Sequence, residues 1–122
     1  MVENAEQGSG DRVLLDQGRV SLRVDTGVCR FDAKIVCWME EGMLRCAIES
    51  RCPHVDDFAN ALGPCELMTA LRMPFSENHV YIVGGRTLKH STCPLPMAVL
   101  KGFEVAAGLA LKRDVSVIFD RA

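Results

Sequence analysis

The chain lacks an excess of charge of either sign. Its 14 lysines and arginines are balanced by 16 aspartates and glutamates, which gives a formal net charge of −2. Without a basic excess, the main electrostatic attraction to nucleic acid or to an anionic membrane surface is missing. Aromatic residues make up only 6% of the chain, too few for a surface on which bases stack. The sequence therefore predicts a protein that binds neither nucleic acid nor membranes.

Long apolar runs and targeting segments are also lacking. The longest mostly apolar stretch, Val105 to Leu111, is far shorter than the ~18 residues of a membrane span. Residues 1–16 are polar and acidic, without the basic start and apolar centre of a secretory signal. We therefore expect a cytoplasmic protein. In that reducing compartment, cysteines serve metal binding, catalysis or burial more often than disulfides.

The length of 122 residues is that of one domain, and it is sufficient to bury a core without metal or disulfide staples. Residues 1–12 are mostly polar, and this composition predicts a flexible amino-terminal arm. We expect residues 13–122 to form a single domain.

The first half of this domain is predicted to be a meander of three antiparallel strands. Apolar and polar residues alternate with a period of two, which is typical of half-buried strands, over residues 20–25, 33–39 and 44–49. Glu41 and Gly42 fit a tight hairpin between the second and third strands. In such a meander, the turn after the first strand and the end of the third strand lie at the same edge of the sheet.

The second half is predicted to be mostly helical. Prolines suit the first turn of a helix, and they predict helices over residues 53–62, 64–73 and 94–111. In the last of these helices, Gly102 and Gly108 each cost ~1 kcal/mol relative to Ala, which indicates close packing of the backbone there.

The remaining segments decide the predicted fold class. Residues 78–90 could form a helix or a strand, because Gly84 and Gly85 weaken a helix there. Alternating apolar residues predict a last strand: Val115, Val117 and Phe119. The order β-β-β-α-α-α-β predicts an α+β fold, a mainly antiparallel four-stranded sheet with helices packed on one face.

The six cysteines fall into two groups by position. Cys37 and Cys46 lie inside predicted strands, where a free cysteine behaves as a small buried hydrophobe. The other four lie at the ends of predicted elements: Cys29, Cys52, Cys65 and Cys93.

Three of the element-end cysteines adjoin a proline that begins a predicted helix. At such a position, free backbone N–H groups and the helix dipole lower the pKa of a thiol and favour the thiolate. The thiolate is the form that binds a metal or attacks a substrate. Basic neighbours act in the same direction: Arg30, Arg51, Lys89 and His90.

These positions predict a metal or iron–sulfur site built from Cys29, Cys52, Cys65 and Cys93, although no pair has the CxxC spacing of known zinc or cluster motifs. Four thiolates suit an iron–sulfur cluster or zinc equally. The helix of residues 53–62 is ~13 Å long and carries Cys65 away from Cys52.

The stronger set is therefore Cys29, Cys52 and Cys93, and either His54 or His90 could complete a tetrahedral site in place of the fourth cysteine. Two other interpretations stay open. The protein could be a non-enzymatic interaction module with buried structural cysteines, or a thiol-based redox or sulfur-handling protein that uses Cys52 or Cys93. Nothing in the sequence indicates a particular protein partner or a homo-oligomer.

Beyond these arguments, several short motifs carry a resemblance that spans about Val20 to Asp120. They are residues 27–31 (GVCRF), 49–54 (ESRCPH), 65–66 (CE), 93–96 (CPLP) and 100–111 (LKGFEVAAGLAL). The chain resembles a small uncharacterised family of anaerobic bacteria and methanogenic archaea.

This family has no assigned activity, so the resemblance implies shared motifs rather than a reaction. It implies that the four element-end cysteines belong to recurrent motifs, whereas Cys37 and Cys46 do not. Anaerobic hosts would agree with an oxygen-sensitive iron–sulfur site. The chain departs from the pattern at Gly84-Gly85 and at Met97-Ala98.

Overall fold

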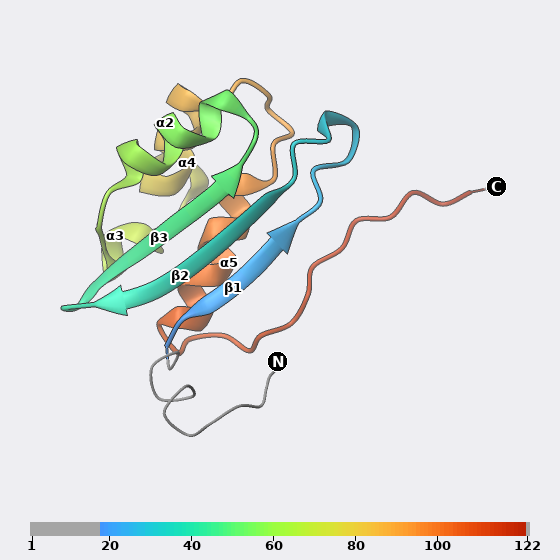
Figure 1. Cartoon of the computed structure of the whole chain (residues 1–122). Helices are drawn as coiled ribbons and strands as arrows, with labels where there is room; N and C mark the ends of the chain where they lie inside the picture. Colours follow the sequence, from blue (N-terminus) through green and yellow to red (C-terminus); the bar gives the residue numbers. More distant parts are fainter. Residues whose placement is uncertain (1–17, 122) are drawn as a thin grey trace.

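Four strands form an antiparallel sheet in the order β1-β2-β3-β4, and the helices cover one of its faces (Figure 1). The computed structural model describes residues 18–121, so the predicted arm of residues 1–12 lies outside the described part. Along the chain the elements are β1 (Val20–Val24), η1 (Gly27–Cys29), β2 (Ala33–Glu40), β3 (Met43–Ser50), α2 (Pro53–Leu62), β4 (Cys65–Glu66), α3 (Leu67–Ala70), η2 (Phe75–Glu77), α4 (His79–Thr87) and α5 (Leu95–Ala106). The predicted α+β class is confirmed.

The three long strands form the predicted meander. Glu41 and Gly42 have φ angles of 53° and 79°, as the tight turn of a two-residue hairpin requires. Strands β2 and β3 pair along their whole length. Side chains that alternate toward the helices are fully buried, among them Ile35, Cys37 and Leu44.

Helix α5 packs on β1 and β2, and α2 packs on β3 and α4. The approach of α5 is close because residue 102 has no side chain. A Cβ at Gly102 would stand 2.6 Å from Cys37 Sγ and 2.8 Å from Leu22 Cδ1, which confirms the close packing expected there.

Among the helices of residues 18–121, none is both long and apolar enough to cross a membrane.

Residues 79–87 are helical, which resolves the alternatives left by the sequence. Asn78 begins this helix, since its side-chain oxygen accepts hydrogen bonds from the N–H groups of Val80 and Tyr81. Gly84 is buried in α4, and a Cβ there would lie only 2.9 Å from Pro96 Cγ of α5. The glycine that weakens the helix locally therefore allows α4 to approach α5.

The helix predicted over residues 64–73 is wrong. Cys65 and Glu66 are instead extended and pair with Leu44 and Met43 of β3, which makes them the fourth strand of the sheet. Only the short helix α3, Leu67–Ala70, follows. The pairing partner lies about twenty residues earlier in the chain, so local sequence patterns do not reveal it.

The end predicted for the last helix is also wrong, because α5 ends at Ala106 rather than near residue 111. The Gly108 N–H donates to Val105 O at 3.0 Å, and the Leu109 N–H donates to Glu104 O at 2.8 Å. With Gly108 at φ 77°, these bonds form a Schellman cap. Gly108 therefore ends the helix rather than packing against a neighbour.

The predicted last strand is absent from the described sheet. Residues 111–121 have no regular secondary structure, and all of them are exposed. The chain order is therefore β-β-β-α-β-α-α-α, apart from the short 3-10 turns.

Candidate functional site

Three of the four element-end cysteines lie in segments that meet at one end of the sheet (Figure 1). Cys29 ends η1, Cys52 is the N-cap of α2, and Cys93 directly precedes Pro94, the N-cap of α5. We refer to Cys29, Cys52 and Cys93 as the cysteine trio. The charge of a thiolate at Cys52 or Cys29 acts on the thiol of Cys93. The expectation that Cys29 and Cys52 lie at the same edge of the sheet thus agrees with the structure.

Ser50 connects two of the segments that carry the trio. Its hydroxyl donates to the carbonyl oxygen of Phe31 at 3.2 Å, and the hydroxyl oxygen of Ser50 accepts the Cys52 N–H at 3.2 Å. The pairing of Ser50 with Ala33 in the sheet places Ser50 next to the β1–β2 connection. The start of α2 is therefore fastened to the loop that carries Cys29.

The loop that carries Cys29 is a compact turn with its own hydrogen bonds. Asp25 Oδ1 accepts the Gly27 N–H at 2.9 Å, and Asp32 Oδ1 accepts the Thr26 N–H at 3.3 Å. The Arg30 N–H donates to Gly27 O at 3.0 Å, with Arg30 at φ 65°. The turn leaves Cys29 exposed. Its thiol is thus presented to solvent on an ordered loop.

Cys52 and Cys93 are half-buried and pack against the edge of the core. The N–H of Cys93 donates to the carbonyl oxygen of His90 at 3.0 Å, which closes the turn before α5. Burial raises the pKa of the Cys93 thiol, and the neighbouring thiolates of Cys52 and Cys29 raise it further, whereas a hydrogen bond from the Leu95 backbone lowers it. The sequence predicted a lowered pKa for this thiol. That prediction is wrong for Cys93 because burial outweighs the helix terminus.

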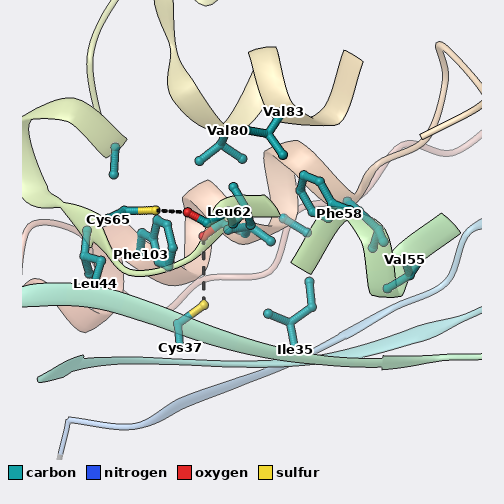
Figure 2. Close-up of a cluster of buried hydrophobic side chains, with 14 of the residues drawn as sticks. Ile35, Cys37, Leu44, Val55, Phe58, Leu62, Cys65, Val80, Val83 and Phe103 are labelled. Atoms are coloured by element: carbon teal, nitrogen blue, oxygen red, sulfur yellow. Dashed lines mark hydrogen bonds between the residues drawn. The ribbon is translucent and has the colours of Figure 1, made fainter. Parts of the chain in front are cut away.

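The structure places Cys65 away from the trio. Cys65 pairs with Leu44 near the start of β3, whereas Cys52 follows the other end of that strand, ~20 Å away at ~3.3 Å per residue. Its thiol lies in the core and donates to the carbonyl oxygen of Leu62 at 3.6 Å (Figure 2). The carbonyl oxygen of Gly63 is a second acceptor at 3.5 Å. Burial raises the pKa of the Cys65 thiol. The four element-end cysteines are therefore not gathered at one point.

Cys37 and Cys46 are structural, as the sequence predicts. They face each other across β2 and β3, and Cys37 is fully buried, with its Sγ 4.0 Å from Val99 O. Burial raises the pKa of Cys46 to about 12, with a further contribution from Cys65. Burial also raises the pKa of Cys37. Both thiols therefore stay protonated in the folded protein at neutral pH.

The two histidines considered as substitutes lie beside the trio in sequence. His54 is half-buried in the first turn of α2, two residues after Cys52, and His90 is exposed in the loop before Cys93. Within residues 18–121, no group of three or more His, Cys, Asp or Glu side chains is arranged so that it could hold a metal ion. Metal binding by the trio would therefore require its loops to close.

Sequence reasoning did not identify Ser50, which fastens the trio loops, or Asn78, which fastens α4. The side chain of Asn78 is 4% exposed, and it also donates to the carbonyl oxygens of Ala70 and Arg72, both at 2.9 Å. The available signals were the position of Ser50 two residues before Cys52 and that of Asn78 directly before an apolar helix.

The fold and these residues define a small α+β protein with helices on one face of an antiparallel sheet and three cysteines at one end. The model of a family of unknown function, DUF6951, matches residues 20–119, so the chain belongs to this family. This agrees with the resemblance to an uncharacterised family, while the predicted anaerobic hosts stay a prediction. Neither the curated proteins nor the solved structures contain a significant match.

Proposed function

We propose that the protein binds a thiolate-ligated metal, zinc or the iron of an iron–sulfur cluster, through Cys29, Cys52 and Cys93. The observation that carries this proposal is that three separate segments bring their cysteines to one end of the sheet (Figure 1), where the charges of Cys52 and Cys29 each act on Cys93. Thiolates gathered in this way repel one another, and a bound cation reverses that repulsion.

The surroundings of the trio favour an anionic metal–thiolate group. Cys52 and Cys93 lie at the N-termini of α2 and α5, helices of 10 and 12 residues, whose free N–H groups and positive dipole ends stabilise negative charge. Arg30, Arg51 and Lys89 lie next to the trio segments in the sequence. Their charge would offset the negative charge that three thiolates bring to a metal.

Three protein thiolates leave one position of a tetrahedral site open. His54 or His90 is the internal candidate for that position, and Cys65 is not, because its thiol is held in the core. The segments that would close on the metal are η1 with Cys29 and the loop of residues 88–94, which both lie outside the long helices and strands. Metal binding would bring these two loops closer together at the fixed start of α2.

The raised pKa of Cys93 favours this function over a thiol enzyme that uses Cys93 as a free nucleophile. Reactive cysteines have a lowered pKa, so that the thiolate forms near neutral pH. A metal instead displaces the proton when it binds, and the binding energy drives the deprotonation. A half-buried thiol with two cysteine neighbours is therefore better suited to ligation than to attack.

The test is the metal and acid-labile sulfide content of protein purified without oxygen and without added metal, together with its visible absorption spectrum. We expect about one zinc per chain, or iron with matching sulfide. Cys52→Ser and Cys93→Ser should lose the metal. Cys65→Ala is the matched control and should keep it.

Two results would overturn the proposal. One is protein that holds no metal when isolated and takes up none on reconstitution with zinc or with iron and sulfide. The other is equal metal loss from Cys65→Ala and the trio variants in proteins with unchanged circular dichroism, since that requires a ligand set other than the trio.

A further inference from the structure

Strand β1 leaves one long edge of the sheet open. It is the end strand in the order β1-β2-β3-β4, and in the part of the chain that the structure describes its outer edge pairs with no strand. The opposite edge is formed by β4, which has only two residues. A five-residue open edge presents unpaired N–H and C=O groups and accepts an additional strand readily.

The segment after α5 has the sequence of a strand but no partner. We refer to residues 109–121 as the trailing segment. Val115, Val117 and Phe119 alternate in it, and they are 50%, 89% and 78% exposed. Figure 1 shows this segment leaving the end of α5 and extending away from the sheet. Large apolar side chains at alternating positions of an extended, exposed segment favour its pairing with the edge of a sheet.

The trailing segment and β1 match in pattern. Strand β1 turns Val20, Leu22 and Val24 toward the helices, and Leu22 reaches α5 at Gly102. A strand added beyond β1 would continue this apolar face with Val115, Val117 and Phe119. Residues 114–120 are long enough to cover all five residues of β1.

The two segments also match in charge on the opposite face. Arg19 and Arg23 flank the open face of β1, and the Arg19 guanidinium lies 4.4 Å from the centre of the Trp38 ring. The positions of the trailing segment that would share this face begin and end with Asp114 and Asp120. The two arginines are four residues apart and the two aspartates six, so a given register places one aspartate directly opposite an arginine, and that pair of opposite charges stabilises the pairing.

We propose that the protein forms a symmetric dimer in which residues 114–120 of each chain add a strand to the open edge of β1 in the other chain. Each chain carries both the added strand and the edge that receives it, so one two-fold axis satisfies both pairings at once. Residues 109–113 form the connection, which spans up to ~17 Å when extended. The dimer does not depend on the proposed metal.

The test measures the mass of the full chain in solution by light scattering, for the wild type and two adjacent variants. We expect the wild type to have twice the 13.4 kDa of one chain. Val117→Asp places a charge on the face that packs against α5 and should give a monomer. Ile118→Asp, at a residue 81% exposed on the other face, is the matched control and should stay dimeric. Both side chains are exposed within one chain, so neither change should unfold it.

Hydrogen exchange of the same samples identifies the pairing. In the dimer, amides of β1 and of residues 114–120 should be protected together, and Val117→Asp should remove both protections. A monomer would overturn the proposal, whether its trailing segment is unprotected or is protected by folding onto its own β1. A dimer that survives Val117→Asp, or that Ile118→Asp dissociates equally, would also overturn it.

Discussion

Gly102 of α5 lies so close to Cys37 of β2 that a Cβ on residue 102 would stand 2.6 Å from Cys37 Sγ. We predict that Gly102→Ala lowers the free energy of unfolding by about 1–3 kcal/mol, because the overpacked helix must move away from the sheet. This loss exceeds the gain in helix propensity of ~1 kcal/mol. Urea unfolding followed by circular dichroism measures the change.

Gly85 supplies the control for this prediction. It lies on the exposed side of α4, and a Cβ there would meet no atom within 4 Å. Gly85→Ala should therefore stabilise the protein by about 0.5–1 kcal/mol through helix propensity alone. If the two alanine variants had the same effect, close packing at Gly102 would not be the cause.

Asn78 joins the start of α4 to the segment after α3 through four hydrogen bonds. We predict that Asn78→Ala destabilises the protein by about 2–4 kcal/mol, since it removes a helix cap worth ~1 kcal/mol and leaves buried carbonyl groups unpaired at ~1–3 kcal/mol. Thermal and urea unfolding measure the loss. Asn60→Ala, at an exposed position in α2, should change stability by less than ~0.5 kcal/mol, and a comparable loss there would contradict the assignment.

Stability should fall at alkaline pH because of the core thiols. Burial raises the pKa of Cys46 from 9.0 to about 12, and Cys65 adds to the rise. Between these values the unfolded chain releases the proton while the folded chain keeps it. The stabilisation is therefore complete below the ordinary pKa and is lost as the pH rises toward about 12.

The unfolding free energy measured in urea across this pH range tests the effect. We expect a shallower decline for Cys46→Ala, which removes the titrating group. Ser21→Ala, at an exposed position without a titrating side chain, offers the control, because it should decline as steeply as the wild type. Equal slopes for all three proteins would assign the alkaline loss to other groups.

The cysteines should react with an alkylating reagent in a fixed order. Exposed Cys29 should be modified first and half-buried Cys52 and Cys93 later, while Cys37 and Cys65 should react only after unfolding, since they are 0% and 3% exposed. Zinc added before the reagent should slow Cys29, Cys52 and Cys93 together. Mass spectrometry of the digested protein measures each rate. Protection of Cys65 alone, or of none, would contradict metal binding by the trio.

The elements that sequence could predict are those whose cause is local. Alternation and a Glu41-Gly42 turn are sufficient to define the β2–β3 hairpin. The two-residue strand β4 escapes such reasoning, because Cys65 is extended only through its pairing with Leu44. The pattern at Val115 and Val117 has the converse problem. It records the tendency to form a strand, but residues 111–121 have no regular secondary structure in the described chain, because a strand also needs an edge to pair with.

Within the candidate site, the positions of the cysteines in the sequence predict which three lie together but not the pKa of the Cys93 thiol. That Cys29 and Cys52 share an edge follows from the meander, and a helix length is sufficient to separate Cys65 from Cys52. The burial of Cys93 depends on how α5 packs on the sheet, and this burial is the largest cause of the raised pKa of its thiol. The close packing predicted at Gly108 is wrong, because close packing and a helix C-cap both favour glycine and the sequence does not distinguish them.

The contact between Arg19 and Trp38 gives the protein an intrinsic optical probe. Trp38 is the single tryptophan of the chain, its indole N–H donates to Glu40 at 3.1 Å, and its ring lies under the guanidinium that begins the open edge. Indole emission responds to nearby charge and to water. If a strand pairs with the outer edge of β1 as proposed, the tryptophan fluorescence of the unmodified protein should change. A dilution series would then measure how the proposed dimer dissociates.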